Sequence, residues 1–295
     1  MRGVALEMKE RLLKLFGKPG RHKADSAATA RHEAADAGAG RSGETVFAAE
    51  TVDRGLRFRS LTLPEAEQPS IRLEAPTQPA FKIRVARTTG FRRAAGGLVG
   101  RRYGDRGYLI PNTPSEPDLY SFLAYDEGQI VGTVSIRLDS SRGLSADDLY
   151  HEELEALRRS GWKICEFTRL AVDVKTASKP VLAGLFHTAY LYAARIRGYD
   201  YAVIEVNPRH VAFYRRALGF EPIGPERMNR RVDAPAVLLC VAFDTIAKGV
   251  AEYGGQAERA TQVRSLFPFG FGPDEEAGIL QRLRELDATR NGPPK

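Results

Sequence analysis

From Phe81 onward, runs rich in β-branched and aromatic residues alternate with amphipathic stretches, and this alternation restricts the possible folds more than any other feature. The first run, "FKIRVA", alternates apolar with basic side chains as a half-buried strand does. The runs "LYSFLAY" and "IVGTVSIRL" flank residues 126–128, Asp-Glu-Gly, which is a hairpin signal. Residues 91–103, between the first strand and this hairpin, predict a basic helix.

The helices that follow are marked by signals at their ends. Residues 145–148, Ser-Ala-Asp-Asp, resemble a capping box and predict a helix start. A long apolar-periodic helix closes at Gly198, and in "PRHVAFYRRALGF" Pro208 lies near the start of a helix and Gly219 past its end. The runs "WKICEFTRLAVD", "YAVIEV" and "AVLLCVAF" predict strands, with a short strand added at residues 221–223.

The N-terminal part has a different composition. Residues 1–24 hold seven basic and two acidic side chains, so most of the formal net charge of +7 lies there. The rest is close to neutral, which removes most of the support for a nucleic-acid partner. Residues 4–16 predict an amphipathic basic helix, which either lies on an anionic membrane surface or is a tail helix without a partner. Residues 17–78, rich in Ala, Gly, Glu, Pro and Ser, predict a disordered linker.

These changes divide the chain into three predicted parts. Residues 1–78 form the basic segment and linker, residues 79–244 the folded domain, and residues 245–295 a C-terminal helical extension. The two cysteines lack metal or disulfide spacing, and the scattered histidines lack ligand spacing, so we expect no metal and a reducing cytoplasm. No apolar run approaches the ~20 residues that a membrane span needs.

The predicted order of elements, β, α, β, β, α, β, α, β, α, β, resembles the acetyltransferase-like (GNAT) fold. Within "VNPRHVAFYRRALGF", six residues match the late strand–helix motif of that superfamily: Asn207, Ala212, Phe213, Tyr214, Gly219 and Phe220. The segment "CEFTRLAVD" is similar to the Glu-x-x-Arg strand of acyl-homoserine-lactone synthases. Together with "LSADDLY" before it, "VNPRHVAFY" after it and the closing "AVLLCVAF", it more closely resembles the N-acyl amino acid synthases of the FeeM type.

The resemblance implies an α+β fold, an α/β/α sandwich with a mixed, mostly antiparallel central sheet. It also implies an acyltransferase that moves a long-chain acyl group from an acyl carrier protein thioester to the amine of an amino acid. No cofactor would be bound, because the acyl thioester of 4′-phosphopantetheine or of coenzyme A is a co-substrate.

The donor loop departs from the ordinary GNAT pattern. Those enzymes have an Arg/Gln-x-x-Gly-x-Gly/Ala loop whose backbone amides hold the coenzyme A pyrophosphate, whereas this chain has "VKTASKP", with no glycine. A carrier-protein phosphopantetheine has one phosphate and needs a simpler cradle. Lys175, Ser178 and Lys179, near a helix start, are candidates for it, together with Asn207 of the motif. The alternative is that both lysines are solvated loop charges.

Acyl transfer to an amine needs a base, because an amino-acid amine is mostly protonated at neutral pH. Glu166, a carboxylate in an otherwise apolar strand, is the candidate base; the alternative is a structural ion pair with Arg169. Residues three apart in a regular strand point to opposite faces, so both reach one face only if a β-bulge lies between them. Arg169 would position a substrate carboxylate or the carbonyl. Arg137 is a second candidate for this task or a strand-end surface charge.

Two side chains of the late helix complete the candidate site. Tyr214 matches the tyrosine with which many GNAT enzymes protonate the departing thiolate; packing is its alternative role. His210, one turn earlier, is either an auxiliary base or a structural histidine. Cys165 faces away from Glu166 in a regular strand and is predicted to be a core residue.

Three other functions stay open. The first is a coenzyme A-dependent GNAT N-acetyltransferase that acts on a small amine, against which the glycine-free loop counts. The second is an acyl-homoserine-lactone synthase, whose N-terminal Arg/Phe/Trp set is missing because the only tryptophan is Trp162. The third is an inactive GNAT-fold module that binds partners.

Overall fold

The computed structural model describes residues 45–50, 79–86, 95–100, 116, 118–173 and 178–291. The predicted amphipathic helix at residues 4–16 and most of the predicted linker lie outside these ranges. Of the predicted basic helix, residues 95–100 are described, and they are helical.

A nine-stranded sheet forms the middle layer, with the order β1-β2-β3-β4-β5-β6-β9-β7 and with β8 paired to β9. All neighbouring strands are antiparallel except β5 and β6, which are parallel. The strands are β1 Thr45–Glu50, β2 Pro79–Val85, β3 Leu119–Asp126, β4 Gln129–Leu138, β5 Ile164–Val172, β6 Tyr201–Val206, β7 Glu221–Pro222, β8 Arg227–Asn229 and β9 Ala234–Ala242. The predicted hairpin and the short strand after the late helix are confirmed.

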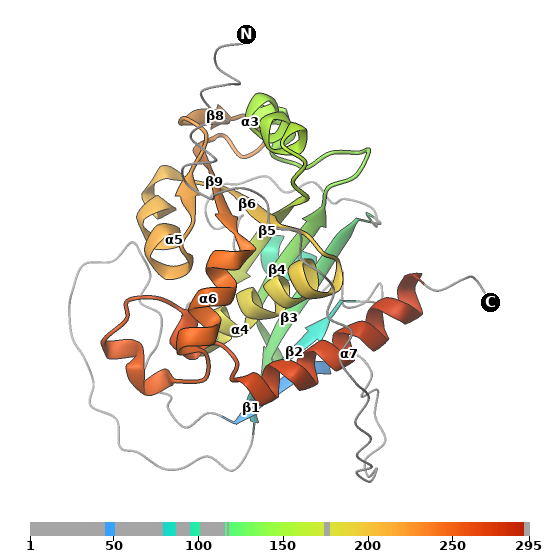
Figure 1. The fold of residues 1–295 in the computed structure, drawn as a ribbon, viewed down its shortest axis with the longest axis vertical. Helices are drawn as coiled ribbons and strands as arrows, with labels where there is room; N and C mark the ends of the chain where they lie inside the picture. Colours follow the sequence, from blue (N-terminus) through green and yellow to red (C-terminus); the bar gives the residue numbers. More distant parts are fainter. Residues whose placement is uncertain are drawn as a thin grey trace.

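Helices cover both faces of this sheet (Figure 1). α4 and α7 pack in one core with Phe81 and Phe167, whereas α3 packs in a second core with Ile164 and Val203. Because Ile164 and Phe167 are three apart in one strand, their side chains point to opposite faces. The helices are α3 Asp147–Arg159, α4 Lys179–Tyr190, the π-helix η2 Leu191–Ile196, η3 Pro208–His210, α5 Val211–Leu218, α6 Phe243–Tyr253, η4 Ala257–Thr261, η5 Phe267–Phe269 and α7 Pro273–Asn291.

The predicted capping box is wrong. α3 begins at Asp147, its cap residue is Ala146, and no side chain caps it. Ser145 is engaged elsewhere: its hydroxyl accepts a hydrogen bond from Arg137, and its backbone N–H donates to Glu166. The serine that looked like a helix cap therefore belongs to the polar network described below.

The prediction of a disordered linker across residues 17–78 is wrong at Thr45–Glu50, which form β1 and pair with β2. The composition averaged over residues 17–78 is polar and hid this strand. The strand itself contains Val46 and Phe47, which are both buried. The Phe47 ring lies 4.3 Å from that of Phe271, and the Val46 carbonyl accepts from Arg282 of α7. The N-terminal strand and the C-terminal extension thus pack on the same sheet as the central region.

Candidate active site

β5 has a bulge close to Glu166. Thr168 pairs with Ser135 of β4, and the next pair is Ala171 with Thr133, so two residues of β5, Arg169 and Leu170, lie opposite one residue of β4. Arg169 sits in this irregularity with φ of 52°, the left-handed region that side chains other than glycine rarely adopt. A bulge is present, but it lies at Arg169 and Leu170 and not between Glu166 and Arg169 as predicted.

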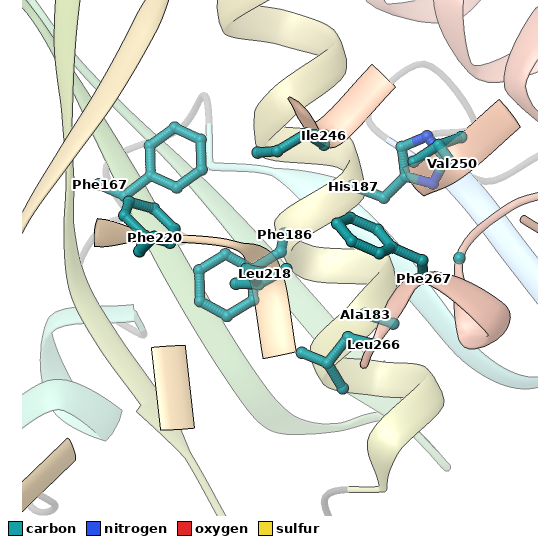
Figure 2. Close-up of a pocket in the computed structure, with 11 residues that line it drawn as sticks. Phe167, Ala183, Phe186, His187, Leu218, Phe220, Ile246, Val250, Leu266 and Phe267 are labelled. Atoms are coloured by element: carbon teal, nitrogen blue, oxygen red, sulfur yellow. The ribbon is translucent and has the colours of Figure 1, made fainter. Parts of the chain in front are cut away.

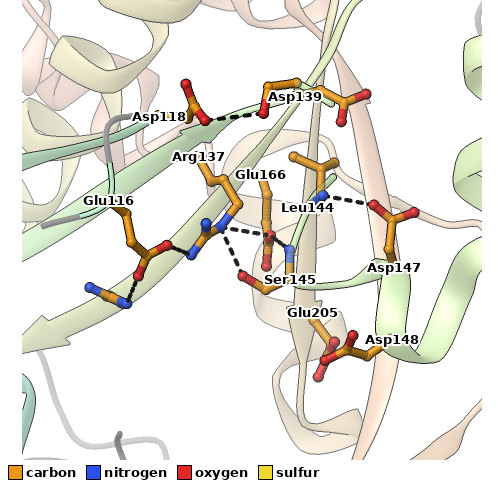
Figure 3. A network of polar contacts seen from close by, with 12 residues as sticks. Glu116, Asp118, Arg137, Asp139, Leu144, Ser145, Asp147, Asp148, Glu166 and Glu205 are labelled. Carbon is orange, nitrogen blue, oxygen red and sulfur yellow. Dashed lines mark hydrogen bonds and ion pairs between the residues drawn. The ribbon is translucent and has the colours of Figure 1, made fainter. Parts of the chain in front are cut away.

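A network of polar contacts joins β5 to β4 and to the loop before α3 (Figure 3). Arg169 Nη2 donates to Glu116 Oε1 at 2.8 Å, and the other Glu116 oxygen pairs with Arg137. Arg137 Nε donates to the Ser145 hydroxyl at 3.0 Å and lies 4.0 Å from Glu166 Oε2. The Ser145 backbone N–H donates to the same Glu166 oxygen at 2.6 Å. The bulge therefore brings Arg169 into one network with Glu166, linked through Glu116 and Arg137.

The environment of Glu166 suits a proton acceptor at neutral pH. Its side chain is buried, with 3% exposure. Burial raises its pKa from 4.5 to about 7, opposed by the Ser145 hydrogen bond and by the positive charge of Arg137. The negative charge of Glu205 also contributes to this increase of the pKa. Near pH 7 the group is then divided between its acidic and basic forms, which is the condition for efficient general-base catalysis.

β5 and β6 separate next to Glu166. Their parallel pairing runs from Ile164 with Tyr201 to Glu166 with Val203 and goes no further, although both strands continue. Phe167 follows Glu166 and points to the opposite face of the sheet. Where the pairing ends, Glu166 therefore lies on the α3 face of β5 and Phe167 on the α4 face.

Sequence reasoning missed a second carboxylate on the α3 face. Glu205 follows Val203 by two residues in β6, so it shares the face of Glu166. It accepts from Asn229 and, at 3.2 Å, from Arg231, and burial raises its pKa. The same signal that selected Glu166, a carboxylate inside an apolar run, marks Glu205 in "YAVIEV".

An apolar pocket lies on the α4 face (Figure 2). It holds about 370 Å³ of space when its open mouth is included. Aromatic and aliphatic side chains from β5, α4, α6 and the segments near α5 and η5 point into it. Its lining residues are Phe167, Ala183, Phe186, His187, Leu218, Phe220, Ile246, Val250, Leu266, Phe267 and Gly270.

The two candidates of the late motif come from η3 and α5. The half-buried Tyr214 ring lies 6.3 Å from Phe186 and 6.0 Å from Phe220, two walls of the pocket. His210 ends η3, and its Nε2 accepts from Arg209 Nε at 3.2 Å. Tyr214 thus lies beside the apolar pocket.

The candidate donor residues surround the starts of α4 and η3. The Ser178 hydroxyl caps α4 by accepting from Val181 N at 3.4 Å, and Lys179 Nζ lies 5.7 Å from the centre of the Phe269 ring. The Asn207 side chain caps η3. Lys175 lies outside the described residues. The first turn of α4 has no acidic side chain, so its positive dipole end is not neutralised from within the helix.

Cys165 is fully buried, as predicted for a core residue, and burial raises the pKa of its thiol. Within the described ranges, no group of three or more His, Cys, Asp or Glu could hold a metal ion. The helices of these ranges include none with the length and apolarity for a membrane span.

The fold and the bulged, diverging strand together define a GNAT-type acyltransferase. The family of the N-acyl amino acid synthase FeeM matches residues 94–242, just over half of the 295 residues. The chain belongs to this family, and it is an N-acyltransferase.

One solved structure agrees with this assignment. The structure of FeeM, an N-acyl amino acid synthase from uncultured soil microbes, is 30% identical with a TM-score of 0.52, over 57% of this chain and 94% of that chain. Two others are similar at the level of the fold. The AHL synthase LasI is 16% identical over 55% and 90% of the two chains, with a TM-score of 0.41. An acyl-CoA N-acyltransferase from Pseudomonas aeruginosa is 13% identical over 54% and 97%, with a TM-score of 0.40. No curated protein matches this chain.

Proposed function

We propose that this protein transfers a long-chain acyl group from an acyl carrier protein thioester to the α-amine of an amino acid. The observation that carries the proposal is Glu166, a buried carboxyl with a pKa of about 7 at the point where β5 and β6 separate. A base of this pKa can take a proton from an amine at neutral pH, and we place the thioester where the pairing of β5 and β6 ends beside it.

The chemistry divides between the two faces of the sheet. Glu166 first takes a proton from the substrate ammonium and later releases it to solvent, and the neutral amine so formed attacks the thioester carbonyl on the α3 face. The new C–N bond forms as the C–S bond breaks, and the departing thiolate takes a proton from the Tyr214 hydroxyl. The second proton of the nitrogen replaces the proton that Tyr214 gives to the thiolate. The acyl chain then lies on the α4 face, where Phe167 begins the apolar pocket.

The acceptor side suits an amino acid because it offers both signs of charge. Two arginines converge on the carboxylate of Glu116, and each guanidinium has five N–H donors, so the pair suits a substrate carboxylate. Glu205 offers a carboxylate to the substrate ammonium on the same face: each of its oxygens has two lone pairs, so both can accept further hydrogen bonds. We assign Arg169 and Arg137 to binding the substrate carboxylate and Glu205 to binding the substrate ammonium group. His210 is the second candidate for the general base.

The donor side favours a carrier protein over coenzyme A. The "VKTASKP" loop lacks the glycines that bring backbone amides close to a pyrophosphate. The start of α4, with Lys179, provides positive charge for one phosphate and for an acidic carrier, and Lys175 precedes Lys179 by four residues in the sequence. Ser178 caps the N-terminus of α4, and Asn207 caps the N-terminus of η3. We assign both residues to holding these two helix starts in position for the phosphopantetheine.

Mass spectrometry of lipid extracts tests the proposal. Cells that overproduce the protein should accumulate an N-acyl amino acid, and cells that overproduce the Glu166→Gln variant to the same level should accumulate far less. An acetylated small amine in place of the lipid would support the coenzyme A-dependent alternative. No new product from either strain would support a binding module and overturn the proposal.

A further inference from the structure

The apolar pocket has walls from two parts of the chain (Figure 2). Six lining residues, from Phe167 to Phe220, lie inside the region that matches the FeeM family, residues 94–242. The other five come after it, in α6 and around η5: Ile246, Val250, Leu266, Phe267 and Gly270. The C-terminal extension therefore closes a pocket that begins beside the catalytic strand.

Backbone contacts fix this C-terminal wall to the rest of the fold. The Phe271 N–H donates to His187 Nδ1 at 3.0 Å, and the Leu266 N–H donates to the Ala217 carbonyl at 2.9 Å. α6 also approaches η5 closely, since a Cβ added at Gly249 would lie 2.5 Å from the Phe267 ring. A wall held at these points sets a fixed end to the pocket.

The lining indicates what the pocket binds. Apart from His187, every lining side chain is apolar. His187 Nδ1 accepts from the Phe271 N–H, and Nε2 is buried 3.4 Å from Glu276 Oε2. A pocket whose lining is apolar apart from one histidine suits an unsubstituted alkyl chain, which it selects by size. Phe167 lines the pocket and follows Glu166 in β5, so the pocket begins one residue from the proposed base.

We infer that the segment from α6 to η5 gauges the length of the donor's acyl chain, so that chain-length specificity is set by residues outside the region shared with the FeeM family. This inference rests on the proposed function and adds the structural element that determines which acyl thioester is used. A side chain at the end of the pocket then acts as a stop, and each methylene beyond it costs about tenfold or more in relative rate.

Substitutions at Val250 and Leu266 test the gauge. Val250→Phe fills the pocket and should shift the preferred chain to shorter donors, whereas Val250→Ala should shift it to longer ones. Leu266→Ala should act like Val250→Ala at an independent position. Val250 is half-buried, so its variants disturb the fold least. Leu280→Ala is the matched control, because Leu280 is a buried core residue of α7 that does not line the pocket.

The readout is the product ratio when the full-length protein is given a mixture of acyl carrier protein donors of graded chain length. A ratio is used because a general loss of stability lowers all products together. We expect changes of about tenfold or more in opposite directions for the two Val250 variants and an unchanged ratio for Leu280→Ala. Wild-type ratios in all three pocket variants, or an equal shift in the control, would overturn the gauge while the proposed function stands. Wild-type protein that transfers no acyl group would refute the proposed function and this inference with it.

Discussion

Replacing Glu166 with glutamine separates a catalytic carboxylate from a structural one. The side chain keeps its volume, so packing around it should survive. If Glu166 is the general base, turnover should fall by roughly 10²–10⁴-fold. A structural role predicts a lower melting temperature with turnover nearly unchanged.

The stability effect can be worked out from the pKa. Burial raises it from 4.5 to about 7, which corresponds to about 3 kcal/mol against the ionised form in the fold. Between these pH values the folded protein binds more protons than the unfolded chain, so the free energy of unfolding should fall as the pH rises. The Glu166→Gln variant lacks this loss. It should be at least as stable as the wild type above pH 7, apart from the weakened contacts with Ser145 and Arg137.

Two pH series provide the assay. Wild-type kcat/KM should show an acidic limb with a midpoint near the pKa of Glu166, and the variant should lack it. Denaturant melts over the same pH range report stability. Glu153→Gln is the control, because Glu153 is equally buried and paired with Arg227, but lies on α3. If wild type and Glu166→Gln share the same acidic limb, Glu166 is not the titrating base, and His210 is the next residue to replace.

Four further predictions follow from the site and the fold. For one acyl chain, kcat/KM should be higher with the carrier protein than with coenzyme A; equal use of both would refute the assignment of the donor loop. Glu205→Gln should raise the KM for the amino acid by about 10–100-fold with little change in the donor KM. The control Glu153→Gln should leave both KM values unchanged. An unchanged KM in Glu205→Gln would mean that Glu205 only binds Asn229 and Arg231. Tyr214→Phe should lower kcat by about 10²-fold, measured by single turnover; full activity would leave Tyr214 a packing residue. Deleting residues 1–44 should preserve turnover, whereas deleting 1–78 removes β1 and should cost about 3 kcal/mol or more in denaturant melts; equal stability of the two truncations would contradict the packing of β1.

Much of the fold could be predicted because its signals are local. The strands from β2 to β9 have apolar runs bounded by turn residues, and the helix ends at Gly198 and Gly219 are marked by glycines with φ of 67° and 78°. β1 was missed because six residues with strand character lie within a long polar stretch. Only pairing with β2 and cover from α7 make that strand stable, and neither is visible in local sequence.

The spacing of Glu166 and Arg169 could be read from the sequence, but the residues that contact them could not. Two charged residues three apart in one strand demanded a bulge between them; a bulge is present, but it lies at Arg169 and Leu170. Ser145 was misassigned because a serine before a helix satisfies the same local rule whether it caps the helix or binds a neighbouring strand. Glu116 could not be found, because its role depends on meeting Arg137 and Arg169 from a distant loop. Glu205 could have been found by the criterion that selected Glu166.

The most direct test of the central claim is a reconstituted reaction with purified protein, one long-chain acyl carrier protein and a mixture of amino acids, with products identified by mass spectrometry. The predicted result is an N-acyl amino acid whose formation requires the carrier thioester and is nearly abolished in Glu166→Gln. Active wild-type protein that acylates only a non-amino-acid amine, or a Glu166→Gln variant with full turnover, would contradict the account.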